Sequence, residues 1–338
     1  PVTNVLNTLL KKTRLYFPLI LIFSFSTMAA KRTVDQDGGA QYNNLSDAIK
    51  AASASAGDTI YIVGNDVDTY DESWPMNINS IVHFMSDKND PDSFPIVRLS
   101  GGDWNNYWTN HGGTNRFERI VLDSCETINL SHNNRICIID RCVIQNFTSP
   151  VFTLKDNATN YLLISNTIFR NNATIFPRIA NKNNNGPYGS AINCTFFNND
   201  SVQAENSINP EQVSNQKFID ITNCIFAGNT VNLADADLKS VYTYNLLPTS
   251  ESGWGEGSVY SNNPGFIGEN PASISDFRLS ASSPAINAGT NTGAPLTDIA
   301  GNSRSSTDIG AFEWIPTVFG DYTWDKDAAA GIQPGGGT

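Results

Sequence analysis

The 338-residue sequence has few charged residues, and basic residues are fewer than acidic ones. Charged side chains make up 16% of the chain, against about 25% in typical soluble domains. The 21 basic and 33 acidic residues leave a formal net charge of −12. Nucleic acids and anionic membrane surfaces both require a basic protein surface, so this balance argues against either as a partner.

Several patterns that carry chemistry are also missing. The five cysteines form no Cys-x-x-Cys pair with a matching histidine cluster, and the three histidines are scattered without a zinc-binding spacing. There is no nucleophile elbow, P-loop or dinucleotide fingerprint. Leucine-rich frames and Gly-Gly-x-Gly-x-Asp runs are absent, which excludes two other repeat folds. The aromatic content of 10% is nevertheless that of a chain with a packed core.

One apolar run stands near the start of the chain. Residues 11–30 read KKTRLYFPLILIFSFSTMAA, with a basic beginning, an apolar centre over residues 15–25 and small residues at the end. This layout is typical of a secretory signal peptide, and the apolar centre is shorter than the ~20 residues of a membrane span. We therefore expect residues 1–30 to be a signal peptide, with an uncleaved anchor as the alternative. The mature protein is then secreted or held at the cell surface, with no membrane span.

The middle of the chain repeats. The segments IIDRCVIQNF (138–147), LISNTIFRNN (163–172), SAINCTFFNN (190–199) and DITNCIFAGN (220–229) align without gaps. One column holds Cys142, Thr167, Cys194 and Cys224, and the column before it holds Arg141, Asn166, Asn193 and Asn223. Later columns hold Ile144, Phe169, Phe196 and Phe226, and then Asn146, Asn171, Asn198 and Gly228. We expect a fifth copy, VLDSCETIN at 121–129, to fit the same frame through Cys125.

Each repeat consists of two short β-type runs around a corner that contains asparagine. Such a unit cannot bury its apolar face alone, so the copies must stack. The sequence therefore predicts an all-β fold, a right-handed parallel β-helix in which equivalent residues lie about 4.8 Å apart. Asparagine suits the corners because it tolerates left-handed backbone conformations. The cysteines are predicted to be buried ladder residues, with disulfides between coils or a metal site as alternatives.

Residues 31–64 open this fold. We expect a strand from Val34, a short amphipathic helix over 45–54 that caps the end of the β-helix, and a strand at TIYIV. The order Thr-Val-Asp, AIKAA and GDTIYIV resembles the start of pectate-lyase-like β-helix proteins. That resemblance implies possible polysaccharide chemistry: lyases abstract a proton beside a uronate carboxylate with help from Ca²⁺, and hydrolases need two or three carboxylates close together.

The block at 262–313 contains NNPGF, DFRL, SPAINAG, DIAGNSR and DIGAFE in order. It resembles the choice-of-anchor Q domain of bacterial surface proteins, which implies a final β-helix turn and cap. The β-helix is thus expected over 31–313, with 314–338 as a linker or truncated tail. The charges Asp298, Arg304, Asp308 and Glu313 suggest an arginine–carboxylate lock, and Asp298 with Asp308 could alternatively bind Ca²⁺. The sequence points to no other cofactor.

Catalytic candidates come from the repeat columns. Asp123 and Asp140 both stand two positions before a cysteine, so adjacent coils would bring their carboxylates to about 5 Å. Arg141 lies beside them, and Lys155 lies in a nearby loop. Such a group could bind Ca²⁺ or act as a lyase or hydrolase centre, while surface acids paired with arginine are the alternative.

Binding candidates are the aromatic segment Trp104, Tyr107 and Trp108 with His111, and Arg170 on a central coil. Aromatic faces stack on the apolar faces of sugars, although packing of the segment against the β-helix is equally open. The leading interpretation is a monomeric extracellular β-helix protein that binds polysaccharide. A polysaccharide lyase or glycoside hydrolase, and a non-catalytic adhesin or spacer, are the alternatives, because the fold hosts all three.

Overall fold

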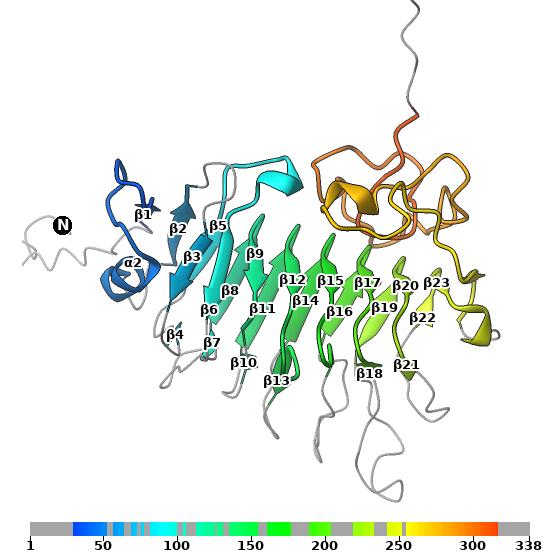
Figure 1. The fold of residues 1–338 in the computed structure, drawn as a ribbon, viewed down its shortest axis with the longest axis horizontal. Coiled ribbons are helices and arrows are strands. Elements are labelled where there is room, and N and C mark those ends of the chain that lie inside the picture. The colour runs from blue at the N-terminus through cyan, green and yellow to red at the C-terminus, as the bar shows by residue number, and fades with distance from the viewer. Residues whose placement is uncertain are drawn as a thin grey trace, which may run out of the picture.

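The computed structural model describes residues 30–52, 57–63, 69–72, 76–77, 82–99, 104–105, 113–125, 127–130, 135–154, 161–176, 189–203, 219–232, 242–251 and 255–316. These residues form a right-handed parallel β-helix, a single-stranded solenoid, followed by a C-terminal lobe over residues 261–316 (Figure 1). Right-handed crossovers are the rule for parallel strands. No helix in the described part of the chain is long and apolar enough to cross a membrane.

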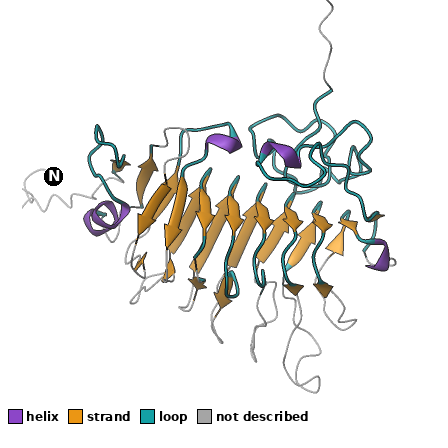
Figure 2. Ribbon diagram, in the orientation of Figure 1, coloured by secondary structure: helices purple, strands orange, loops and turns teal. Residues whose placement is uncertain are grey.

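Three parallel sheets form the sides of the solenoid (Figure 2). Sheet A has nine strands, in the order β1 (Lys31–Val34), β2 (Asp58–Ile62), β5 (Val82–Met85), β8 (Gly113–Glu118), β11 (Arg135–Asp140), β14 (Tyr161–Ser165), β16 (Gly189–Ile192), β19 (Asp220–Thr222) and β22 (Tyr242–Thr243). Sheet B has the order β3 (Thr69–Glu72), β6 (Ile96–Leu99), β9 (Val121–Asp123), β12 (Val143–Gln145), β15 (Ile168–Arg170), β17 (Thr195–Phe197), β20 (Ile225–Ala227), β23 (Leu246–Leu247) and β24 (Val259–Tyr260).

Sheet C is shorter. Its strands are β4 (Met76–Asn77), β7 (Trp104–Asn105), β10 (Ile128–Leu130) and β13 (Phe152–Leu154), and β18 (Val202–Gln203) pairs separately with β21 (Val231–Asn232). The described residues include the helix α2 (Leu45–Ala51) and the single-turn helices η1 (Pro91–Ser93), η3 (Thr249–Glu251) and η4 (Ser275–Phe277).

The predicted columns are confirmed for the four later copies. The strand register places Phe169 opposite Phe196, and Phe196 opposite Phe226. Their rings stack with centroids 5.0 Å and 4.9 Å apart inside the solenoid. All five cysteines are buried and free, so the disulfide alternative is wrong. Cys142, Cys194 and Cys224 lie in the predicted ladder, each directly before a residue of the paired strands β12, β17 and β20. Cys125 follows β9 and lies outside that column.

The corners adopt the left-handed conformation that the asparagines predict. The turn from sheet A to sheet B places Arg119, Arg141, Asn166, Asn193 and Asn223 at φ between 48° and 56°. The next corner places Ser124, Asn146, Asn171, Asn198 and Gly228 at φ between 51° and 67°. Asparagine accepts this conformation at low cost because its short side chain bonds locally, and glycine accepts it because it has no Cβ.

The frame predicted for the fifth copy is wrong. Residues 121–123 pair with Val143–Gln145 in sheet B, not with the strand before Cys142. Asp123 therefore lies opposite Gln145, whereas Asp140 lies opposite Glu118 in sheet A. The letters VLDSC and IIDRC look alike, but the true counterpart of Asp140 comes five residues before Asp123. The predicted pairing of Asp123 with Asp140 is wrong for this reason.

The N-terminal helix caps the solenoid as expected, although it ends at Ala51. Asn44 accepts a hydrogen bond from the N–H of Asp47 at its start, and Leu45, Ala48 and Ile49 are buried against the first coil. Capping the open end covers apolar interior that would otherwise meet water.

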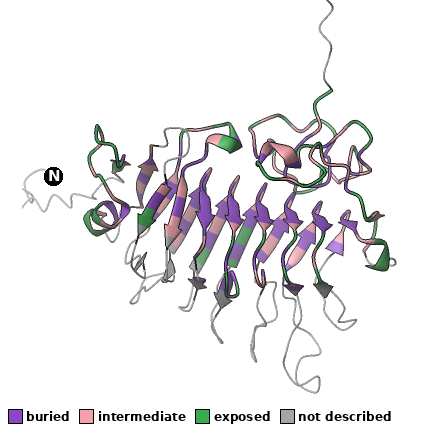
Figure 3. Ribbon diagram, viewed as in Figure 1, coloured by how far each residue is buried: buried purple, intermediate pink, exposed green. Residues whose placement is uncertain are grey.

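Residues 262–313 differ from the expected last turn. The chain leaves the stack after β24 and lies over the outer face of sheet B (Figure 1). There Phe277, Ile299 and Phe312 pack on outward residues of sheet B, Val143 and Ile168 among them. The lobe therefore covers the outer face of sheet B at these strands. Along the coils that the lobe does not cover, Figure 3 shows exposed positions interspersed with buried ones.

Candidate functional site

An apolar strip lies on the outer face of sheet A. Alternation along β11 and β14 turns Cys137, Ile139, Leu162 and Ile164 inward. It turns the residues that we call the apolar strip outward: Ile136, Ile138, Tyr161 and Leu163. The register sets Ile136 opposite Tyr161 and Ile138 opposite Leu163. Ile136 is 37% exposed, Tyr161 45% and Leu163 38%, so these adjoining apolar side chains form one exposed patch and a candidate interaction surface.

A charged corner borders the strip at the C-terminal ends of β8 and β11. It comprises Arg116, Glu118, Arg119, Asp140 and Arg141. Arg116 bridges the two acids, with Nε 2.8 Å from an oxygen of Glu118 and Nη2 3.1 Å from an oxygen of Asp140. Arg119 and Arg141 both reach the other oxygen of Glu118. Three guanidiniums thus face two carboxylates, which leaves one positive charge over.

The corner contains backbone strain. Arg119 and Arg141 have φ of 56° and 52°, a conformation that costs an ordinary L-residue roughly 1–2 kcal/mol. The same column holds asparagine in the next three coils, where the conformation is cheap. The arginines are held there by their ion pairs with Glu118, and strain of this kind clusters at functional sites.

The carboxylates of the corner are poorly placed for proton transfer. Asp140 accepts hydrogen bonds from Arg116, Ser165 and Asn166, so both of its oxygens are occupied. Glu118 is likewise bound through both oxygens. A general base needs an oxygen that can approach the substrate proton. The arrangement is better suited to orienting donors around a bound ligand.

Two of the predicted catalytic residues, Asp140 and Arg141, are thus brought together. Their partners Arg116 and Glu118, and the apolar strip, were missed. A signal was present, because Arg116, Glu118 and the buried Phe117 alternate as a strand with one polar face. Lys155 lies outside the described residues, so its role stays a prediction.

Asp123 belongs to a separate ladder on sheet B. Arg98 donates to it through Nη2 at 2.7 Å and Nε at 3.1 Å, and Asn146 donates at 2.7 Å. Burial alone would raise the pKa of Asp123, but the hydrogen bonds from Arg98, Asn146 and Ser124 hold it below its usual value. This carboxylate is therefore a fixed anion, matched to Arg98.

Arg170 follows in the same ladder, two strands further on. Its Nε donates to Gln145 Oε1 and its Nη1 donates to the carbonyl of Ala272 in the lobe, both at 2.7 Å. Burial lowers the pKa of Arg170. It lines a hollow of about 250 Å³ between sheet B and the lobe. In this position Arg170 holds the lobe, and its predicted contact with substrate is not tested.

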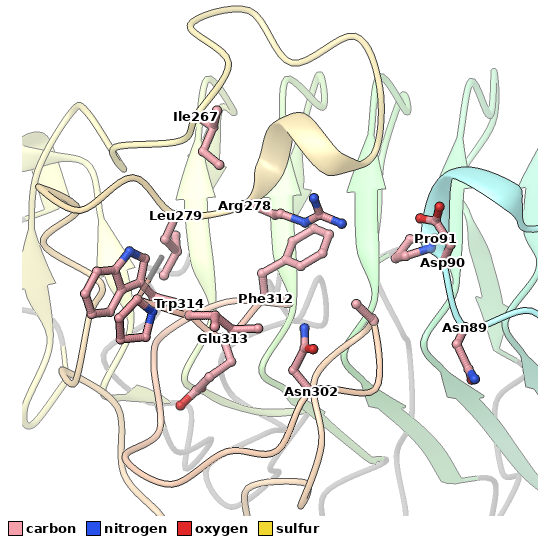
Figure 4. A pocket seen from close by; sticks show the side chains of 13 residues that line it. Asn89, Asp90, Pro91, Ile267, Arg278, Leu279, Asn302, Phe312, Glu313 and Trp314 are labelled. Carbon is pink, nitrogen blue, oxygen red and sulfur yellow. The ribbon is translucent and has the colours of Figure 1, made fainter. Parts of the chain in front are cut away.

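A larger hollow of about 670 Å³ lies between residues 89–91 and the lobe (Figure 4). Its lining includes Arg278, Phe312 and Trp314 from the lobe. Asp92 lines the smaller hollow and accepts hydrogen bonds from the backbone N–H groups of Ile274 and Ser275 at 2.7 Å and 3.0 Å.

The predicted aromatic segment lies largely outside the described residues. The backbone of Trp104 forms part of β7 in sheet C. Tyr107, Trp108 and His111 are not described. Their proposed contact with sugars stays a prediction.

The lobe contains the expected arginine–carboxylate lock. Arg304, whose side chain is 1% exposed, donates to Glu313 Oε2 at 2.8 Å and to Asn166 Oδ1 at 3.1 Å. Burial raises the pKa of Glu313 and lowers that of Arg304. Asn166 also donates to Asp140, so the lock ties the lobe to the charged corner.

The calcium alternative at Asp298 and Asp308 has no support among the described residues. Asp298 accepts from the N–H groups of Ala300, Asn302 and Glu313, and Asp308 accepts from those of Asn287 and Trp314. Carboxylates surrounded by N–H donors are not arranged as oxygen ligands for Ca²⁺. In the part of the chain that is described, no group of three or more His, Cys, Asp or Glu side chains is placed to hold a metal ion.

No protein-family model and no curated protein matches this chain. Among solved structures, the chain is similar to the deglycosylated pectin methylesterase from Aspergillus niger, with a TM-score of 0.37 and 12% identity over 68% of this chain and 82% of that one. It is also similar to the pectate lyase Pel9A, with a TM-score of 0.36 and 16% identity over 85% and 97% of the two chains. At these scores the likeness identifies no activity or substrate. The resemblance of residues 262–313 to the choice-of-anchor Q domain stays a prediction.

Proposed function

We propose that the protein binds polysaccharide along the outer face of sheet A, at the apolar strip and the charged corner, in a secreted or cell-surface location. The observation that carries this proposal is the exposure of Tyr161 and Leu163 beside Ile136 on two adjacent strands. Sugar rings present apolar faces and hydroxyl edges. A tyrosine ring and aliphatic side chains suit the faces, and guanidinium and carboxylate groups suit the edges.

The regular geometry of the sheet also supports a polymeric ligand. Parallel strands repeat about every 4.8 Å, so the outward side chains of successive coils line up along the solenoid axis. Beyond the apolar strip the outward face carries the hydroxyl groups of Ser190 and Thr222. A glycan chain that runs along the axis would meet the apolar strip on two strands and these hydroxyl groups on the next two. A protein that acts only as a structural spacer would not need an exposed apolar strip, because a uniformly polar face would be sufficient for that role.

Binding is favoured over catalysis by the state of the two acids. Glu118 and Asp140 are both engaged by arginine, so neither is a free base. A lyase or hydrolase would need a further group, and Lys155 is the candidate that the sequence offers. The enzyme alternative is therefore kept as an outcome of the test.

The test applies the purified protein to immobilised pectin, alginate, chondroitin and neutral hemicelluloses. We expect retention on at least one glycan, and Tyr161→Ser should reduce it because the stacking surface is lost. The matched control is Leu296→Ser, which changes a residue 87% exposed on the lobe and should leave retention unchanged. Equal loss in both variants, or no retention at all, would contradict the proposal.

The same samples are assayed for unsaturated products and new reducing ends, with and without Ca²⁺. We expect no product from any glycan. Product formation that Asp140→Asn abolishes would instead identify a polysaccharide-cleaving enzyme centred on the charged corner.

A further inference from the structure

The larger hollow has a polar end and an apolar end, and it is separate from sheet A. We call it the lobe hollow and define it by Asp90, Arg278, Leu279, Phe312 and Trp314. Figure 4 shows Arg278 above the Phe312 ring, with Asp90 and Pro91 across from it and Trp314 and Leu279 on the other side. A volume of about 670 Å³ is within the range of small-molecule sites, which is roughly 300–1,000 Å³.

Arg278 is an exposed arginine at this hollow, and no described residue pairs with its guanidinium. Among the arginines whose side chains are described, the other seven donate to a carboxylate, an amide or a carbonyl oxygen. The guanidinium of Arg278 has no hydrogen bond or ion pair within the described residues, and it rests 5.8 Å from the ring centroid of Phe312. An arginine held on an aromatic ring keeps its donors free for a planar anion such as a carboxylate.

The nearby acids leave that charge available. Glu313 also lines the hollow, but Arg304 lies 2.8 Å from it and neutralises it. Asp90 stands on the opposite side of the hollow, where it accepts a hydrogen bond from the N–H of Asp92. One anionic group is therefore attracted to Arg278, and a second one near residues 89–91 would be repelled.

The apolar end of the hollow carries exposed side chains. Ile267 and Ile315 line the same hollow and are 62% and 55% exposed, and Trp314 is half-buried beside them. An apolar ligand body would bury these side chains and its own surface at once, and removing both apolar surfaces from water gives a favourable free energy of binding.

We propose that the lobe hollow binds a small monocarboxylate with an apolar body, its carboxylate on Arg278 and its body against Trp314 and Leu279. The site is independent of the glycan surface on sheet A. A neutral analogue would lose the ion pair, and a dicarboxylate would meet Asp90.

Calorimetric titration of the full chain with indole-3-acetate and with its neutral amide tests the proposal. We expect the acid to bind at least tenfold more tightly than the amide, which corresponds to about 1.4 kcal/mol. Arg278→Met keeps the contact with Phe312 but removes the charge, so this variant should bind acid and amide equally. The matched control is Lys50→Met, which removes an exposed charge from α2 and should preserve the tenfold preference.

Equal affinity of the unaltered protein for acid and amide would overturn the proposal, as would a preference that survives in Arg278→Met. Absence of binding by either probe would overturn it as well. Glycan retention by Arg278→Met is measured in parallel and should equal that of the unaltered protein. A loss there would show that the two surfaces are one site and would contradict their independence.

Discussion

Glu118 and Asp140 lie directly opposite each other on neighbouring strands of sheet A, and the guanidinium of Arg116 bridges them. Two like charges in adjacent positions of a sheet repel each other. Their juxtaposition is stable because three arginines converge on it, two of them from strained corner positions. The charged corner is thus a network whose members depend on one another.

Arg116→Met should destabilise the protein by about 1.5–3 kcal/mol at pH 7, the range for hydrogen bonds to charged groups. The loss arises because two facing carboxylates lose their bridge. Urea unfolding of both proteins at pH 7 measures the difference. A loss within about 0.5 kcal/mol, the size typical of an ordinary surface substitution, would contradict the network.

Asp123 should contribute stability that depends on pH with a definite sign. Its pKa in the folded protein is lowered relative to the ordinary value of 3.8. Stability from this group is therefore present above the unfolded-state pKa and is lost as the pH falls through the folded-state pKa. Asp123→Asn should be less stable than the unaltered protein at pH 7 and should approach it below pH 3.8. The melting temperatures of the two proteins are compared across that pH range. A difference that stays constant would show that the ion pair with Arg98 contributes no pH-dependent stability.

The left-handed corners predict that two substitutions at one position change the free energy of unfolding by different amounts. Asn171 is exposed, with φ of 55°, on the corner after sheet B. Asn171→Gly should change the free energy of unfolding little, because glycine reaches this conformation freely. Asn171→Val should cost roughly 1–2 kcal/mol more, because its β-branched side chain opposes it. Chemical unfolding of both variants gives the comparison, and equal stabilities would argue against this corner geometry.

Asp92 should control the attachment of the lobe. Asp92→Ala removes the acceptor for the N–H groups of Ile274 and Ser275. We expect faster hydrogen exchange at these two amides, while the amides of β14 and β16 exchange as before. Global acceleration would mean that the lobe and the coils unfold together, and unchanged exchange at 274–275 would mean that Asp92 does not hold the lobe.

The sequence predicted the solenoid well because its determinants are local and repeated. The Phe169 and Phe196 columns and the Asn171 and Asn198 corners each recur at a fixed offset, so a gap-free alignment finds them. The frame predicted for the copy at 121–129 is wrong because it rested on the shared Asp and Cys of VLDSC and IIDRC. It overlooked the strand at 113–118, whose Glu118 is the true neighbour of Asp140.

The lobe and the binding face were harder to predict for physical reasons. The contact of Asp92 with Ile274 joins residues 182 positions apart, and no local pattern signals it. In β14 the side chains of Leu162 and Leu163 are both apolar, although one is buried and the other is exposed. Without a polar alternation, the pattern does not reveal which face meets solvent, so the strip around Tyr161 could not be recognised.

Hydroxyl-radical footprinting of the side chains tests the glycan-binding account most directly. It is applied with and without the glycan that retains the protein. The account predicts that oxidation of Tyr161 and Leu163 falls when the glycan is bound, because the strip is covered, whereas oxidation of Leu296 on the lobe stays the same. Unchanged oxidation of Tyr161 under conditions where the glycan is bound would place the ligand elsewhere and contradict the assignment of sheet A.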